Sequence, residues 1–214
     1  MPIEVRHLTK HYGELKVFED FCIAFEEGKI TALLGPSGCG KTTLLNIISG
    51  LEPYNAGSIS GLDSKSFSYI FQEDRLMPWS TVEQNIRFVL RGRYTDTEIG
   101  KITEQYLKMV GLEQYGHYYP RQLSGGMKQR AAIARAFAYP GDILLMDEPF
   151  KGLDEELKTG LVQSFISLWQ KDKRTAIMVT HDREEAQRIA DDIYILAGKP
   201  LGIEEKIVGN GKKC

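Results

Sequence analysis

Apolar runs bounded by turn residues recur along the chain and predict β-strands. The runs fall at residues 2–8, 21–26, 30–34, 67–72, 142–147, 174–180 and 192–197. The run ILLMD at 143–147 is apolar up to its last residue, which predicts a strand that is buried on both faces.

A helical pattern fills the stretch between the fourth and fifth of these strands. It predicts helices in TVEQNIRFVLRG, TDTEIGKITEQYLKMVG and GGMKQRAAIARAFA. Ser80 with Thr81 and Thr95 with Asp96 are the expected N-caps. Gly92 and Gly111 are the expected helix ends. The pattern therefore predicts an α/β domain that carries a helical insert, and no repeat or low-complexity linker separates the two.

Composition narrows the class of protein. The 214 residues suffice for one large domain with a substantial core, and 27 Lys and Arg against 29 Asp and Glu leave no overall positive charge for nucleic acid. The three cysteines, Cys22, Cys39 and Cys214, have unrelated spacings that suggest neither a disulfide framework nor a zinc site, so a reducing cytoplasm fits. The start MPIEVRHLTK lacks a signal-peptide core and no apolar run is long enough to cross a bilayer, so we expect a chain that does not enter a membrane by itself.

Residues 35–42, GPSGCGKT, match the phosphate-loop pattern G-x-x-x-x-G-K-[ST] between a predicted strand, ITALL, and a helical run, TLLNIISG. Glycines let backbone N–H groups turn toward a phosphate, and the helix N-terminus favours the same anion. Lys41 should then reach the β- and γ-phosphates, Thr42 should place its hydroxyl on Mg²⁺, and Thr43 should bond the α-phosphate. The predicted phosphate-binding residues are Gly35, Pro36, Ser37, Gly38, Cys39, Gly40, Lys41, Thr42 and Thr43.

The thiol inside this loop is a candidate reactive group. Cys39 lies next to a helix N-terminus and Lys41, surroundings that favour the thiolate, so alkylation is expected to abolish ATP binding and prior Mg-ATP to protect. Cys22, inside a predicted strand, is expected to be inert.

Two carboxylates end the apolar strand ILLMDE. Parallel strands deliver side chains to the crevice at their carboxyl ends, where Asp147 can hold a metal through water and Glu148 can act as general base. Such a pair can also merely end a strand, but the phosphate loop makes the catalytic interpretation the stronger one.

Residues 123–130, LSGGMKQR, place two glycines at a predicted helix start. Each costs roughly 1 kcal/mol of helix propensity relative to alanine. One explanation is structural: Ser124 is an N-cap, and the two glycines allow another part of the chain to approach closely. The other is that Gly125 and Gly126 face a ligand.

GPSGCGKT, LSGGM, MDEP and His181 in MVTHD occur in one order, and that order resembles the ATP-binding cassette ATPases from about residue 3 to residue 205. The resemblance implies a P-loop NTPase core with a mainly parallel sheet, at 1–75 and 139–205, and a helical subdomain at 76–138 that carries the signature motif. Residues 206–214 form a tail of the same single domain. The segment from Gly50 to Gln72 is short for this family, which predicts a reduced antiparallel β-subdomain.

The resemblance also assigns roles. The family signature is LSGGQ, here with Met127 at the fifth position, and in the family it closes on the γ-phosphate of ATP held by a second subunit; this implies contacts from Ser124, Gly125 and Gly126. Tyr12 matches the ring that stacks on adenine, with Val17 as a second contact.

Gln72 matches the glutamine that contacts Mg²⁺ and the attacking water, and His181 matches the histidine at the γ-phosphate. Asp154 matches an aspartate that crosses the dimer interface, whereas Lys151 stands where the family has a small residue. The expected catalytic set is Glu148, His181, Gln72 and Lys41, and the expected metal ligands are Thr42, Gln72 and Asp147.

The phrase FQEDRLMPWSTVEQNI, with LSGGMKQRAAIARA and EPFKGLD, looks most like ATPase subunits of nitrate, sulfonate and taurine importers. This implies an ATP- and Mg²⁺-dependent ATPase at the cytoplasmic face of the membrane. It would pair with a second ATPase subunit beneath integral-membrane permease subunits and serve an extracytoplasmic solute-binding protein indirectly, with no nucleic acid. One alternative is a cassette ATPase that acts on DNA or ribosomes, although no coiled coil, zinc module or second cassette is visible. Another is a small-molecule kinase, against which LSGGM and MVTHD argue.

Leu76, Met77, Pro78 and Trp79 form an apolar stretch directly after this glutamine loop. We expect it to be part of the dock for a short cytoplasmic helix of the membrane subunit. The alternative is that Leu76 and Trp79 pack inside the helical subdomain.

Overall fold

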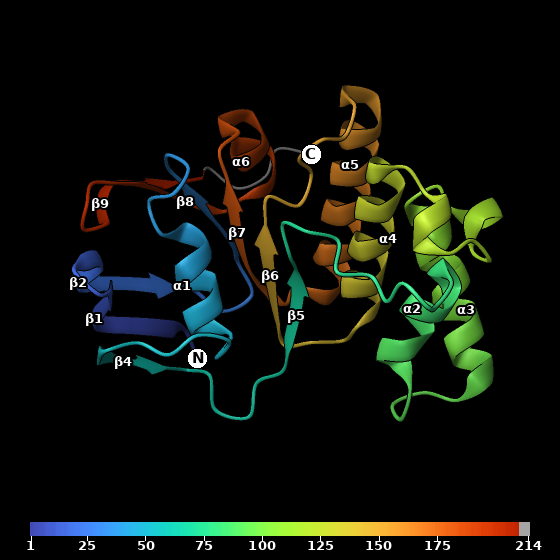
Figure 1. Ribbon diagram of the computed structural model, residues 1–214, viewed down its shortest axis with the longest axis horizontal. Coiled ribbons are helices and arrows are strands. Elements are labelled where there is room, and N and C mark those ends of the chain that lie inside the picture. The colour runs from blue at the N-terminus through green and yellow to red at the C-terminus, as the bar shows by residue number, and fades with distance from the viewer. Residues whose placement is uncertain (210–214) are drawn as a thin grey trace. The chain divides into compact units, whose positions relative to one another are not determined.

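Two units make up residues 1–209, the part of the chain that the computed structural model describes (Figure 1). The first unit comprises residues 1–67, 142–148 and those from 172 onward, and the second comprises 68–141 and 149–171. Cys214 and the last five residues of the predicted tail, 210–214, lie outside the described residues.

The parallel strands of the first unit are the ones with unbroken apolar runs. They are β3 (Ile30–Leu34), β6 (Ile143–Asp147), β7 (Thr175–Thr180) and β8 (Asp192–Ala197). The order is β6-β7-β3-β8, and β9 (Gly202–Val208) pairs antiparallel with β8 at the edge. Every residue of β3, β6 and β7 is buried, as expected for parallel strands covered on both faces. Helix α1 (Lys41–Ile48) packs on β6 and β7, and α6 (Arg183–Ile189) packs on β3 and β7.

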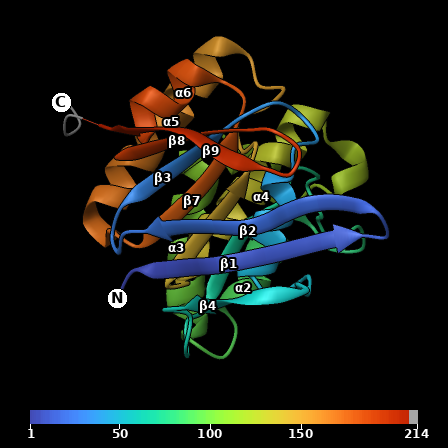
Figure 2. The ribbon, with the colours of Figure 1, turned by 90° about the vertical axis from the view of Figure 1, so that its left-hand side faces the viewer.

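A separate antiparallel sheet completes the first unit. Its strands β1 (Ile3–Tyr12), β2 (Leu15–Phe25) and β4 (Ala56–Ser60) lie in the order β2-β1-β4, as Figure 2 shows. Along β2 the side chains alternate, with Phe21 and Phe25 buried and Cys22 exposed between them. The segment between Gly50 and Gln72 contributes one five-residue strand to this sheet.

Several strand boundaries differ from those that the sequence predicted. Strand β1 continues to residue 12 and β2 begins at 15, because polar residues occupy the solvent face of the hairpin and hide its alternation. Strands β4 and β9 were missed, since neither contains a buried residue. Residues 206–208, which the sequence assigned to a tail, belong to β9.

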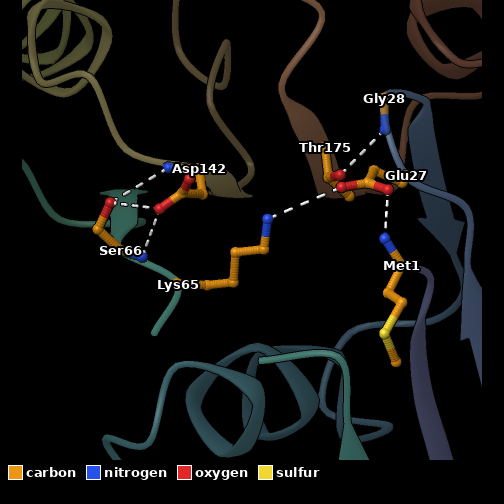
Figure 3. Close-up of polar contacts among 7 residues, drawn as sticks. All are labelled: Met1, Glu27, Gly28, Lys65, Ser66, Asp142 and Thr175. Carbon is orange, nitrogen blue, oxygen red and sulfur yellow. Dashed lines mark hydrogen bonds and ion pairs between the residues drawn. The ribbon is translucent and has the colours of Figure 1, made fainter. Parts of the chain in front are cut away.

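Polar contacts fasten the amino ends of the parallel strands to neighbouring segments (Figure 3). Asp142, just before β6, accepts hydrogen bonds of 2.8 Å from the backbone N–H and the hydroxyl of Ser66. The backbone N–H of Gly28 donates to the Thr175 hydroxyl at 3.0 Å, and Lys65 lies 3.7 Å from Glu27. These contacts lie at the opposite ends of β6 and β7 from Asp147 and Thr180.

The second unit is mainly helical. Its helices are α2 (Val82–Leu90), α3 (Asp96–Met109), α4 (Gly125–Ala138) and α5 (Glu155–Asp172), with short 3₁₀ turns at Glu113–Tyr115 and Pro120–Gln122. Strand β5 (Phe67–Ile70) begins at the last residue of the first unit and continues into this one. Capping boxes at Thr81 and Thr95 confirm the predicted starts of α2 and α3. Gly92 and Gly111 each directly follow the C-cap residue of one of these helices and have a positive φ. Both glycines therefore end a helix, as the sequence predicted.

The division of the chain differs from the one drawn from the sequence. Residues 149–171 lie in the helical unit and not with the core strands, because α5 packs on α4 there and the rings of Phe137 and Phe165 stack 5.1 Å apart. Residues 68–75 also belong to this unit. Helices α5 and α6 were not among the helices that the sequence predicted. Among the described helices, none has the length and hydropathy of a membrane span.

Candidate functional site

The loop between β3 and α1 has the backbone that a phosphate cradle needs. Gly38 and Gly40 have φ values of 74° and 116°, a region that residues with a Cβ adopt at a cost. A Cβ on Gly35 would lie 2.5 Å from the Leu196 carbonyl oxygen, and one on Gly40 would lie 2.7 Å from the side chain of Val17. Pro36, Ser37 and Gly38 are exposed at the tip. Gly38 is therefore required by conformation, Gly35 by space and Gly40 by both.

Lys41 is held inside this loop. Its Nζ donates hydrogen bonds of 2.8 Å to the carbonyl oxygens of Gly35 and Pro36, and the residue is only 5% exposed. The ammonium thus lies at the centre of the loop that the sequence predicted to surround a phosphate.

Thr42 meets Asp147 across the sheet edge. The Thr42 hydroxyl donates a 2.8 Å hydrogen bond to Oδ2 of Asp147, which is the last residue of β6 and is 3% exposed. A buried carboxylate and a hydroxyl side by side form an all-oxygen donor set of the kind that Mg²⁺ prefers.

Glu148 and His181 follow adjacent parallel strands and lie together. Nδ1 of His181 lies 3.2 Å from Oε1 of Glu148, and the Glu148 N–H donates to the Val179 carbonyl at 2.9 Å. Glu148 has a φ of 48°, which is uncommon for a residue other than glycine and is a form of backbone strain often found at functional sites. The turn after β6 therefore aims this carboxylate at the residue that follows β7.

Tyr12 and Val17 flank the phosphate loop within the same unit. Tyr12 is 48% exposed at the end of β1, and its hydroxyl donates to Glu52. The pKa of Tyr12 is raised, mainly by burial and to a smaller extent by the hydrogen bond with Glu52. A hydrogen bond with Thr43 acts in the opposite direction. The Thr43 contact joins the tyrosine to the first turn of α1.

Ser124 caps helix α4 in the second unit, where its Oγ accepts a 3.3 Å hydrogen bond from the Met127 N–H. A Cβ added to Gly125 would meet nothing within 4 Å, and one on Gly126 would make only an ordinary contact, 3.8 Å from Leu153. Neither glycine has a positive φ. The close chain approach offered as the structural explanation is therefore wrong, and nothing within this unit explains the glycines.

These glycines line a cavity of about 620 Å³ in the second unit, together with Gln72, Glu73, Asp74, Arg75, Gln129, Lys151 and Gly152. Gln129 donates from Nε2 to the Pro149 carbonyl at 3.0 Å, which links α4 to the segment before α5. Oδ1 of the exposed Asp154 accepts from the Leu157 N–H at 3.0 Å and so caps the start of α5. The cavity unites the signature glycines with Gln72 and Lys151.

Two residues that the sequence analysis missed hold the loop after β5. Arg135 donates to the carbonyl oxygens of Arg75 at 2.8 Å and Asp74 at 3.1 Å, and its burial lowers its pKa despite the nearby charge of Asp74. Asn85, fully buried, accepts from the Met77 N–H at 2.8 Å and donates to the Thr81 carbonyl at 2.9 Å. Arg135 could have been singled out from the sequence, because it is the one charged residue in the alanine-rich run AAIARAFA.

The accessibility of the two described cysteines is the reverse of what their expected reactivity requires. Cys39, within the phosphate loop, is only 6% exposed, whereas Cys22 lies on the solvent face of β2. Strand alternation turns Cys22 outward, so burial does not support the expectation that Cys22 is inert, and the expected reactivity of Cys39 stays a prediction.

Comparisons with known proteins identify the family of this chain. Residues 18–151 match the family described as ABC transporter. The chain is 38% identical over 213 residues to a taurine import ATP-binding protein of Escherichia coli and 37% identical over 214 residues to an aliphatic sulfonates import ATP-binding protein of Bacillus thuringiensis; each match covers 96% of this chain and 83% of the relative. A solved dimeric ATP-binding cassette in a post-hydrolysis state, bound to ADP and Pi, has a TM-score of 0.86 and 29% identity, with 98% of this chain and 99% of that chain covered. With the phosphate loop, the paired carboxylates and the histidine in place, the chain belongs to the ABC transporter family.

Proposed function

We propose that the chain is the ATP-hydrolysing subunit that powers an importer of a small anionic solute such as nitrate, a sulfonate or taurine. Relatives named as sulfonate and taurine import ATP-binding proteins support the solute class. The observation that carries the proposal is the meeting of the Thr42–Asp147 and Glu148–His181 pairs at the carboxyl ends of β6 and β7, beside the phosphate loop.

The nucleotide would lie along one side of the first unit. Its phosphates would bind the backbone of residues 35–43, and Lys41 would exchange the carbonyl oxygens of Gly35 and Pro36 for phosphate oxygens. The adenine would stack on Tyr12 with Val17 at its edge. Val17 supports this placement because its side chain lies against Gly40 of the phosphate loop, 2.7 Å from the position of a Cβ on that glycine.

Mg²⁺ would bind at Thr42 and Asp147 of the first unit, whereas Gln72, which the sequence also predicted as a ligand, belongs to the second unit. The oxygen donors of the first two fit the ion, and the described residues contain no group of three or more His, Cys, Asp or Glu that could hold a metal by itself. A cation that binds together with the nucleotide phosphates needs only a few protein ligands, because the phosphate oxygens supply others. When bound, the ion would neutralise charge on the β- and γ-phosphates.

Hydrolysis would depend on Glu148 as general base. It would accept a proton from the water that attacks the γ-phosphorus as the bond to the β–γ bridging oxygen breaks. His181, paired with Glu148, would orient the carboxylate and contact the γ-phosphate. The Glu148 backbone conformation supports this role because it holds the carboxylate at the strand end.

A second ATPase subunit would complete the site. Ser124, Gly125 and Gly126 would face the γ-phosphate of ATP on the partner, which accounts for glycines that no contact within the unit requires. Asp154 would cross the same interface. A related cassette solved as a dimer with ADP and Pi supports this arrangement.

Membrane permease subunits would dock at residues 76–79, with an extracytoplasmic solute-binding protein acting through them. Trp79 is 75% exposed and Leu76 only 8%, so the core alternative holds for Leu76 and is wrong for Trp79. An exposed tryptophan on a loop that Asn85 fixes would offer a rigid apolar contact to a helix of the permease. The chain would thus be peripheral, at the cytoplasmic face.

The direct test is phosphate release from Mg-ATP by the purified chain and by Glu148→Gln. We expect hydrolysis by the first and ATP binding without hydrolysis by the second, since the amide cannot accept the proton. Glu156→Gln, a change in an exposed acid on α5, is the control. A wild-type chain that binds no ATP would overturn the proposal.

A further inference from the structure

An ion pair between a buried lysine and a half-buried glutamate lies beneath Tyr12. Lys10 is 7% exposed, which is unusual for a lysine, and its Nζ lies 2.9 Å from Oε1 of Glu52. The same ammonium donates to the Pro53 carbonyl at 2.8 Å and lies 4.5 Å from the centroid of the Tyr12 ring. One lysine therefore joins β1, the loop after α1 and one face of the tyrosine.

Glu52 is the shared acceptor of this cluster. It receives the Tyr12 hydroxyl and the Lys10 ammonium on the same oxygen. Burial would raise the pKa of Glu52, but these two hydrogen bonds and the charge of Lys10 outweigh burial and leave it lowered. Glu52 thus stays ionised at neutral pH and accepts both donors.

The loop that carries Glu52 is itself fixed to β1. The Asn55 N–H donates to the Thr9 carbonyl at 2.9 Å, and the Asn55 side chain accepts from the His11 N–H at 2.9 Å. Glu52 is therefore held at a set position beside Tyr12.

These contacts leave Tyr12 exposed yet restrained. Lys10 covers one ring face, Glu52 holds the hydroxyl, and Thr43 ties the hydroxyl to the helix that follows the phosphate loop. A free aromatic side chain at a hairpin end would lose rotamer freedom on binding a ligand, and a restrained one has already lost it. The opposite ring face is then presented in one orientation relative to the phosphate loop.

We propose that Lys10 and Glu52 are positioning residues for nucleotide binding, which hold the Tyr12 ring as a preset platform for the base at a fixed distance from the triphosphate. The inference rests on the proposed function, in which Tyr12 stacks on adenine. It adds that the affinity contributed by the base depends on the ion pair beneath the ring. The affinity contributed by the phosphates does not.

The test compares the binding of Mg-ATP with that of magnesium tripolyphosphate, which lacks a base, by titration calorimetry. Lys10→Met and Tyr12→Phe should each raise the Kd for Mg-ATP roughly threefold to tenfold, the cost of ordering a side chain on binding. Neither should change the Kd for tripolyphosphate. Lys10→Arg should restore ATP affinity, and Lys16→Met, which breaks an exposed ion pair with Glu19 on β2, is the matched control.

Two outcomes would overturn the inference. One is an equal loss of affinity for both ligands in Lys10→Met, which would mean that the pair only supports the fold. The other is an unchanged ATP affinity in Tyr12→Phe, a change that keeps the ring and removes its hydroxyl tether. Tyr12→Leu separates this inference from the proposed function. If Tyr12→Leu also leaves ATP affinity unchanged, Tyr12 does not contact the adenine. If Tyr12→Leu weakens ATP binding but Tyr12→Phe does not, only the positioning role of the ion pair is rejected.

Discussion

Nδ1 of His181 lies 3.2 Å from Oε1 of Glu148, although 33 residues separate them in the chain. The contact exists because each residue directly follows one of two paired parallel strands, β6 and β7. Parallel topology brings the carboxyl ends of such strands to one edge, where a base and the group that orients it can meet.

Removal of this histidine should slow hydrolysis and leave binding largely intact. His181→Ala is expected to lower kcat about a hundredfold, in the range found for groups that assist proton transfer. His7→Ala is a matched control, because His7 also pairs with a carboxylate, Asp20, at 2.5 Å, but on the antiparallel sheet. Steady-state phosphate release measures both variants, and similar rates in the two would deny His181 its role.

Leu76 and Trp79 of the 76–79 loop should behave differently. Leu76→Ala deletes a buried side chain and should destabilise the isolated chain by about 2 to 4 kcal/mol. Trp79→Ala removes an exposed ring and should leave the thermal midpoint nearly unchanged while weakening assembly with the permease. Co-purification with the membrane subunits measures assembly; a Trp79→Ala chain that assembles normally would reject the dock.

The carboxylate of Asp142 should stabilise the fold in a pH-dependent way. The backbone N–H of Ser66, then its hydroxyl, lower the pKa of Asp142 below its ordinary value. A lowered pKa in the folded state means that the stabilisation is present above the unfolded pKa, near 4, and is lost as the pH falls through the folded value. Asp142→Ala should therefore lower the melting temperature by about 2 to 4 °C at pH 7.

The difference between wild type and Asp142→Ala should then narrow as the pH is lowered from 6 toward 3. Asp63→Ala, a change in an exposed carboxylate of the β4–β5 connection that also carries Ser66, provides the comparison. A gap that stays constant over this pH range would mean that the charge of Asp142 does not contribute.

Thiol labelling should follow exposure. In a Cys214→Ser background, a thiol reagent is expected to modify Cys22 first and the buried Cys39 at least about tenfold more slowly, because reaction requires an accessible thiolate. Cys22→Ser should remove the fast phase. A fast phase that persists in that variant and disappears in Cys39→Ser would restore the original expectation.

Local chemistry made much of this molecule predictable. The phosphate loop is a continuous motif whose glycines are required by backbone geometry, and the strands buried on both faces have unbroken apolar runs. Strands β4 and β9 were missed because neither contains a buried residue or an unbroken apolar run. Thr42 and Asp147 are 105 positions apart; the family resemblance assigned both to one metal site, but no local sequence pattern predicts their direct hydrogen bond. The Lys10–Glu52 pair escaped notice for the same reason, since a lysine in a polar strand end gives no sign that it is buried.

The central claim is that ATP joins two copies of this chain, with the signature residues of one facing the phosphate loop of the other. Glu148→Gln should retain the closed state because it binds ATP without hydrolysing it. Adding Gly125→Arg should prevent closure without disturbing the fold, since a Cβ at Gly125 meets nothing within 4 Å in its own chain.

Sedimentation velocity of Glu148→Gln with and without Mg-ATP tests this claim most directly. We expect a monomer without nucleotide, a dimer at saturating Mg-ATP, and a monomer under both conditions once Gly125→Arg is added. A Glu148→Gln chain that binds Mg-ATP yet remains monomeric at high protein concentration would contradict the account.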